Sequence, residues 1–177
     1  MCSSDLFIRM IANGNASGAA GLILKENILG GTCARACPVE TLCEGVCVRN
    51  HGDDRPVNIG LLQRYAVDQA LDSKTKFFTR ASPTGKTVGI VGAGPAGLAC
   101  AHQLAVLGHQ AVIYEARPKS GGLNEYGLAA YKMLGEFAQR EVDLILSLGG
   151  IDVQHDTILG EDLSLDRKST RLNSSHL

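Results

Sequence analysis

Apolar residues recur at helical spacing over the first part of the chain. The first such set is Leu6, Phe7, Met10 and Ile11, which fall on one face of a helix. Residues 17–27 continue the pattern, and residues 59–71 form a further amphipathic segment that Asn58 can cap. We therefore predict an α-helical domain over residues 1–72.

The hydrophobic pattern changes after a polar stretch without periodicity, residues 73–86, which we interpret as a linker. Beyond it, short apolar runs alternate with helical segments. We predict strands over 86–92, 110–115 and 151–154, and helices over 95–107 and 136–148. Strands that alternate with helices through tight turns form parallel sheets. The fold class is thus α + α/β, with the first part of a Rossmann-like sheet over residues 87–165.

The last residues differ from the rest. The segment 166–176, DRKSTRLNSSH, is polar and matches the translation of one frame of a common sequencing-adapter oligonucleotide. We predict that residues 166–177 are disordered and an artefact of sequence assembly, which excludes them from fold reasoning. On this interpretation the chain is a fragment cut off near Leu165, the alternative being a natural disordered tail.

Composition narrows the function classes. The 177 residues are 45% hydrophobic with a net charge of −1, which favours a packed core and gives no electrostatic attraction to nucleic acid or anionic membranes. No apolar run is long enough to span a bilayer, and the first residues lack the order of a signal peptide. We expect a cytoplasmic protein, in which six cysteines indicate metal binding or redox chemistry before structural disulfides.

Three glycines form a G-x-G-x-x-G motif where the first strand of the sheet meets its helix. Gly92 allows a tight turn, Gly94 lets the backbone approach a pyrophosphate, and Gly97 lets the helix pack closely on the sheet. The helix amino terminus offers free N–H groups to phosphates. About 20 residues further on, Glu115 ends the second strand and can accept hydrogen bonds from ribose hydroxyls. A glycine-rich turn in an ordinary α/β domain is the simpler alternative.

A glycine pair, Gly121–Gly122, follows Glu115 closely. An acidic residue followed by such a pair resembles the flavoprotein disulfide-reductase-like superfamily, whose first dinucleotide unit holds FAD. An NAD site is the second possibility. The candidate cofactor-binding residues are Gly92, Gly94, Pro95, Ala96, Gly97, Glu115, Gly121, Gly122 and Leu123.

Four cysteines lie within fifteen residues in the helical region: Cys33, Cys37, Cys43 and Cys47. Four thiols so close suit tetrahedral sulfur coordination of zinc or of an iron–sulfur cluster. The spacing differs from the paired C-x2-C of zinc ribbons, and Cys37–Pro38 matches the Cys-Pro ending of bacterial ferredoxin motifs. On spacing alone, all four thiols are candidate ligands, and zinc or unliganded cysteines stay open.

The segments FIRMIANGNASGAAGLILKENILGGTCARACPVETLCEGVCV and PVNIGLLQRYA, followed by the glycine motif, resemble the NAD(P)H-accepting portion of dihydropyrimidine dehydrogenase. The resemblance covers residues 7 to about 160. It implies an α-helical ferredoxin-like domain with [4Fe-4S] clusters. The ligands it implies are Cys37, Cys43, Cys47 and an unusual glutamine, Gln63. Cys33 is then not a ligand, and without the resemblance Gln63 is simply an exposed glutamine on a helix.

The resemblance implies an electron relay. NAD(P)H reduces FAD, and the [4Fe-4S] clusters carry electrons to an FMN-containing catalytic partner that reduces uracil or thymine. Two alternatives stay open: a subunit like the small subunit of glutamate synthase, and a non-enzymatic metal- and nucleotide-binding module. The family's upstream four-cysteine stretch and its NAD(P)H-binding unit are absent from this chain, so we expect the chain alone to be inactive.

The remaining candidate residues fit no catalytic pair. His102 and His109 stand apart and are expected to be surface or packing histidines. Cys100 lies in the helix after the glycine motif and is expected to pack in the core.

Overall fold

The computed structural model describes residues 3–52 and 57–164. The adapter-like tail and the remaining segments lie outside the described residues. The first half holds α1 (Ser3–Ala12), α2 (Ala16–Glu26), α3 (Gly30–Ala36), a 3-10 turn η1 (Val48–His51) and α4 (Ile59–Asp72). The second half holds β1 (Thr87–Val91), α5 (Pro95–Val106), β2 (Gln110–Tyr114), α6 (Leu123–Tyr126), α7 (Phe137–Leu146) and β3 (Ile151–Gln154).

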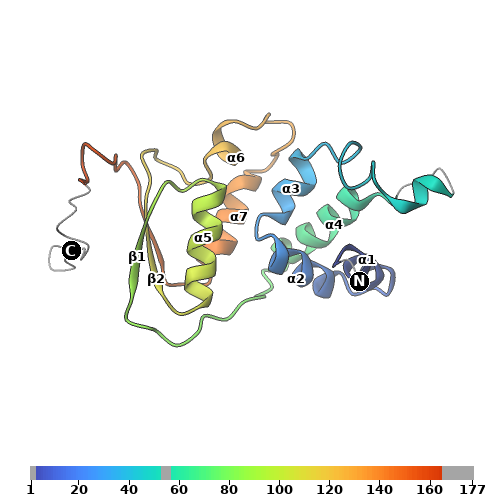
Figure 1. The fold of residues 1–177 in the computed structure, drawn as a ribbon, viewed down its shortest axis with the longest axis horizontal. Helices are drawn as coiled ribbons and strands as arrows, with labels where there is room; N and C mark the ends of the chain where they lie inside the picture. The colour runs from blue at the N-terminus through green and yellow to red at the C-terminus, as the bar shows by residue number, and fades with distance from the viewer. Residues whose placement is uncertain (1–2, 53–56, 165–177) are drawn as a thin grey trace.

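The amino-terminal half is a helical unit, as the periodicity predicts. Helix α2 packs between α1 and α4, and α3 packs on α4 (Figure 1). Phe7, Leu24 and Val67 come from three different helices and are buried together in one core. Asn58 occupies the amino-terminal cap position of α4, although its side chain makes no capping hydrogen bond.

The second half is a three-stranded parallel sheet within the described residues, in the order β1-β2-β3. Helix α5 connects β1 to β2, α7 precedes β3, and these two helices pack on each other. The central strand β2 is buried, whereas alternate residues of β1 are exposed, Val91 among them. Strand β1 is therefore an apolar sheet edge with unpaired backbone groups in the described part of the chain.

The two halves share a core. Residues between α4 and β1 form no helix or strand, as the linker prediction requires, but Phe77 and Phe78 are partly buried against the core. Phe77 packs on Gly21 of α2, and Phe78 meets the ring of His102 of α5 edge-on, with ring centroids 4.5 Å apart. The connection between the halves is thus docked along both of them, because two aromatic side chains gain burial there.

A fully buried carboxylate joins α7 to α3 at the junction. Oε1 of Glu141 accepts hydrogen bonds from the N–H groups of Gly31 (2.8 Å) and Thr32 (3.0 Å), and Oε2 contacts the Thr32 hydroxyl. A side chain at Gly31 would meet Glu141 and the ring of Phe137, so glycine permits this approach. Nearby, the Arg35 guanidinium lies over the Phe137 ring and pairs with Asp68. The helical half is therefore tied to the sheet half by hydrogen bonds and by packing.

Replacing Glu141 by alanine is expected to destabilise the chain by about 3 kcal/mol, because two buried N–H groups lose their acceptor. Glutamine retains an oxygen for both N–H groups, and its amide can donate to the Thr32 hydroxyl. Glu141→Gln should therefore keep most of the stability in urea unfolding at neutral pH. Equal losses from the two variants would contradict this account.

The same variants test a pH dependence. Burial raises the pKa of the Glu141 carboxyl, against the lowering effect of the Thr32 and Gly31 hydrogen bonds and the Arg35 charge. A carboxyl that holds its proton more tightly when folded contributes full stability below its ordinary pKa of 4.5, and this contribution is lost as pH rises through the folded pKa. Glu141→Gln should remove that decline from a urea-unfolding series measured at rising pH.

Candidate functional site

The glycine turn follows the end of β1 and leads into α5. Gly92 has a φ of +92°, a backbone conformation that residues with a side chain rarely adopt. Its N–H donates a hydrogen bond to the carbonyl oxygen of Tyr114 in β2. Gly94 occupies the amino-terminal cap of α5, and no side chain caps this helix. The first helical bond runs from the Leu98 N–H to Gly94 O. The N–H groups of Ala96 and Gly97 therefore precede the helical ladder and point toward the turn, as a phosphate site requires.

The third glycine has the packing role that the motif predicts. A methyl group on Gly97 would overlap the carbonyl oxygen of Gly92, whereas one on Gly94 would meet only the Cα of Gly122, at 3.9 Å. Gly97→Ala should thus force the turn apart and cost roughly 1–3 kcal/mol of stability. Gly94→Ala should be close to neutral in the same thermal unfolding measurement, and a reversed order would contradict the packing assignment.

The glycine pair closes over the turn from the other side. The N–H of Gly121 bonds to Ala93 O at 2.8 Å, and a Cβ on Gly122 would lie 2.7 Å from the Cα of Gly94. Gly122 has a φ of +53° and caps the short helix α6. The two glycine backbones are therefore in direct contact, which only glycine at position 122 permits, and they lie beside the free N–H groups that begin α5 and could bind a pyrophosphate.

Glu115 is buried at the end of β2, and its carboxylate already has protein partners. Oε2 accepts from the Ala93 N–H at 2.6 Å, and Oε1 accepts from the Arg117 N–H at 2.9 Å. It thereby ties the end of β2 to the glycine turn. Each carboxylate oxygen can accept a further hydrogen bond, so the predicted ribose contact stays chemically open.

The structure thus brings the predicted cofactor residues together at one end of the sheet. Ala96 and Leu123 are exposed, Leu123 at 65%. Close by, the buried Ser120 shares a hydrogen bond with His155 (3.0 Å). The spacing of the glycine motif does not predict this pair, because His155 follows β3 and is brought next to Ser120 only when the chain folds.

Helix α3 carries the first two cysteines of the cluster motif. The sulfur atoms of Cys33 and Cys37 lie 3.4 Å apart, one helical turn from each other. Both side chains are half-buried, and burial together with contact with Cys37 raises the pKa of the Cys33 thiol. The Cys37 backbone leaves the helix with a ψ of 139°.

Gln63 of α4 lies beside this pair. Its amide nitrogen donates to the carbonyl oxygen of Gly30 at 2.6 Å, and its side chain is close enough to Cys33 to influence that thiol. Gln63 is half-buried rather than exposed. Its amide oxygen is left to act as a ligand, while the donated bond orients the group, as supporting hydrogen bonds do around metals. The residue therefore fits the ligand role that the family resemblance implies.

The other two cysteines lie on the segment between α3 and α4. Cys43 is exposed and Cys47 is half-buried, and both are free thiols. The carboxylate of Glu44 accepts from the Gly60 N–H at 3.0 Å and so fastens this segment to the start of α4. Among the described residues, no three histidine, cysteine or acidic side chains are gathered as a metal site. The donors fit a sulfur-ligated cluster chemically, but the structure brings together only Cys33, Cys37 and Gln63.

For α5, the expectation for Cys100 is wrong, and the choice left open for His102 between surface and packing is decided. Cys100 is exposed and does not pack in the core. Helix α5 is apolar on most of its surface, and its buried face holds Leu98, Ala101 and Ala105 instead. His102 is a packing histidine, and burial lowers its pKa.

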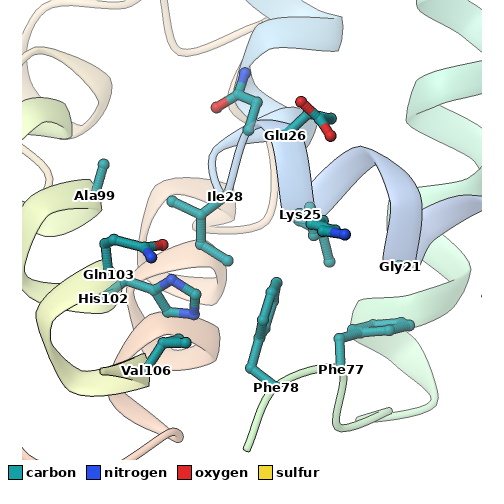
Figure 2. Close-up of a pocket in the computed structure, with 12 residues that line it drawn as sticks. Gly21, Lys25, Glu26, Ile28, Phe77, Phe78, Ala99, His102, Gln103 and Val106 are labelled. Atoms are coloured by element: carbon teal, nitrogen blue, oxygen red, sulfur yellow. The ribbon is translucent and has the colours of Figure 1, made fainter. Parts of the chain in front are cut away.

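A cavity of about 620 Å³ lies between α2, α5 and the connecting segment. Figure 2 shows Phe78 with His102 on one side and Phe77 on the other, below Ile28. Sequence reasoning missed this cavity, because its aromatic residues fall in the segment without periodicity. It lies on α5 away from the glycine turn, so it adds nothing to the dinucleotide cradle.

The two halves match two known families. Residues 2–75 match the family described as dihydropyrimidine dehydrogenase domain II, 4Fe-4S cluster. Residues 90–125 match the NAD(P)-binding Rossmann-like domain family. The predicted order, an iron–sulfur domain before a Rossmann-like unit, is confirmed. No helix in the described part of the chain has the length and apolar character needed to cross a membrane.

Named relatives cover nearly the whole chain. The NAD-dependent dihydropyrimidine dehydrogenase subunit PreT of Salmonella typhimurium is 37% identical over 90% of this chain, which corresponds to 38% of the relative. The glutamate synthase [NADPH] small chain of Escherichia coli is 36% identical over 90% of the chain and 34% of the relative. The NADPH-Fe(3+) oxidoreductase subunit beta of Geobacter sulfurreducens is 38% identical over 88% of this chain and 23% of the relative. The chain thus spans less than two fifths of the length of these relatives.

Proposed function

We propose that this chain, which carries a 4Fe-4S domain of the dihydropyrimidine dehydrogenase type followed by a Rossmann-like domain, is the electron-input part of an oxidoreductase. In the proposal the glycine cradle holds FAD, and Cys37, Cys43, Cys47 and Gln63 supply ligands to [4Fe-4S] clusters. The clusters pass electrons from NAD(P)H to a partner subunit. All three relatives above have names that denote redox enzymes or their subunits.

One observation carries the proposal: the cluster helix and the dinucleotide domain are fastened to each other. The Glu141 carboxylate binds the first N–H groups of α3, and α3 carries Cys33 and Cys37. Figure 1 shows α7 lying between the sheet and the helical unit, next to α3. Electron transfer between two redox groups needs such a fixed arrangement, whereas two unrelated binding modules on a flexible linker do not.

The residues of the cradle bind and orient rather than react. The free N–H groups that begin α5 favour a pyrophosphate, and Glu115 holds the turn in shape while it can still accept from a ribose. FAD, when bound, would accept two electrons as hydride and release them singly. In the dinucleotide half, burial lowers the pKa of His102, and this histidine lies away from the turn.

We further propose that the partner is an FMN-containing catalytic subunit that reduces uracil or thymine, and that the protein works in the cytoplasm. The PreT relative is named as a subunit of a dihydropyrimidine dehydrogenase, which suggests a catalytic partner. A role like that of the glutamate synthase small chain is the second candidate, because that relative is almost equally similar.

The test uses the native polypeptide purified with its partners. We expect bound FAD, iron and acid-labile sulfide, and NAD(P)H oxidation that depends on uracil or thymine. Oxidation that depends on glutamine and 2-oxoglutarate instead would favour the second candidate. Protein that contains neither flavin nor iron would contradict the electron-transfer proposal and support a non-enzymatic binding module.

A further inference from the structure

Two thiols in the cluster-bearing helix are in direct contact. The sulfur atoms of Cys33 and Cys37 are 3.4 Å apart, and both cysteines are free and half-buried. Two thiolates bound to the same zinc ion lie about 3.8 Å apart, from tetrahedral Zn–S bonds of about 2.3 Å. Sulfurs that bind different irons of a cubane cluster are farther apart still. The Cys33–Cys37 contact is therefore closer than shared metal ligation requires.

The Cα separation at this pair suits a disulfide, but the Cβ atoms must also approach each other. Cβ atoms four residues apart on a helix are about 5–6 Å apart, whereas a disulfide holds them at about 3.5–4.5 Å. Residues four apart on a helix have Cα atoms about 6 Å apart, within the range of 4.4–6.8 Å that disulfides usually span. The bond would need the sulfurs to approach by about 1.4 Å, from 3.4 Å to the usual S–S length of about 2.0 Å. Cys37 is the C-cap residue of α3, and its backbone already has an extended ψ. A small shift of the Cys37 backbone therefore does not break the helix.

The two partners are held differently. The start of α3 is fixed from both sides, by Gln63 at the Gly30 carbonyl and by Glu141 at the next two N–H groups. Cys37 begins a segment of turns instead, and the residue after it, Pro38, is exposed. Cys33 thus lies in the fixed part of α3, whereas Cys37 lies at its carboxyl end, where its N–H bonds to Cys33 O at 3.1 Å.

We propose that Cys33 and Cys37 form a reversible disulfide by exchange with a small-molecule disulfide such as oxidised glutathione. One cysteine thiolate attacks a glutathione sulfur, forms a mixed disulfide and releases one glutathione thiolate. The second cysteine thiolate then attacks the mixed disulfide at the protein sulfur and releases the other glutathione. The two cysteines together lose two protons and two electrons, and oxidised glutathione becomes two molecules of reduced glutathione.

The disulfide has a consequence for metal loading. Because it consumes the Cys37 thiol, it removes one of the proposed cluster ligands until a reductant restores it. This consequence rests on the proposed function, whereas disulfide formation does not. Cys33 then serves as a resolving thiol rather than a ligand, which accounts for a cysteine in the motif that the family resemblance leaves without a role.

The primary experiment uses the full chain, reduced, freed of metal and then incubated with oxidised glutathione. After unreacted thiols are alkylated, digestion with trypsin and a glutamate-specific protease separates the cysteines. Cys33 falls in residues 27–35, Cys37 in 36–40, Cys43 in 41–44 and Cys47 in 45–49. We expect residues 27–35 joined to 36–40, with a mass about 2 Da below the sum of the two thiol peptides. Alkylated Cys33 and Cys37, or preferential links to Cys43 or Cys47, would overturn the proposal.

Two variants sharpen the result. Cys33→Ser should abolish the link, and the matched Cys100→Ser should retain it, because Cys100 is exposed on a different domain. The second measurement is iron uptake on anaerobic reconstitution with iron and sulfide. Oxidised wild-type chain should take up less iron than the reduced chain, and dithiothreitol should restore uptake. A disulfide without any effect on iron would contradict the ligand role of Cys37 and leave the disulfide itself established.

Discussion

Replacing Gly94 by valine is expected to abolish FAD retention. Gly94 is the amino-terminal cap of α5, beside the free N–H groups of that helix, and its Cβ position meets only the Cα of Gly122, at 3.9 Å. The two γ-methyl groups of valine would then fill the space that the pyrophosphate needs. The measurement is the flavin content of the purified native polypeptide, read from its visible absorbance. We expect yellow wild-type protein and colourless variant protein.

A matched control separates loss of the cradle from loss of the fold. Gly52 has no atom within 4 Å of its Cβ position and has an ordinary negative φ. Gly52→Val should therefore keep its flavin. Full flavin content in Gly94→Val, with unchanged thermal unfolding, would contradict the FAD assignment and leave an ordinary glycine turn as the explanation.

Replacing Cys37, Cys43 or Cys47 by serine is expected to remove most of the iron from the native polypeptide, because each change deletes a thiolate ligand. Gln63→Leu should have a similar effect, since leucine has no oxygen to bind iron and no amide to bond to Gly30. Iron and acid-labile sulfide are measured chemically and compared with the protein concentration.

Cys33→Ser is the matched control for this series. The Cys33 sulfur is in contact with Cys37 and near Gln63. Replacing Cys33 therefore disturbs the same helix without removing a proposed ligand. We expect it to keep most of the iron. A loss equal to that of the other cysteines would favour the interpretation from spacing alone, in which all four cysteines bind one metal site.

Apolar periodicity and glycine placement predicted most of the helices and strands, because these elements depend on residues that are neighbours in the sequence. The strand predicted over 110–115 is β2, and the helix predicted over 59–71 is α4, within one residue at each end. Apolar periodicity and glycine placement act over a few residues and so can be read directly. The short helices α3 and α6 were not predicted, because seven and four residues are too few to show a helical period.

Side-chain orientation was harder to predict where the pattern has no polar face. Helix α5 reads PAGLACAHQLAV, which is apolar on most of its surface. Such a helix does not reveal which side will meet the sheet. The fold turned Leu98 and Ala101 inward and left Cys100 exposed. The expectation that Cys100 packs in the core failed for this reason.

The sequence by itself determined the order of the two domains, the glycine turn and the set of candidate ligands, since each depends on residue types at short spacing. Only the tertiary structure decided how the domains meet. Glu141 binds Gly31 and Thr32 across more than one hundred residues, and Phe78 of the connecting segment meets His102. Contacts between distant segments follow from packing and burial in three dimensions, and a pattern of neighbouring residues carries no record of them.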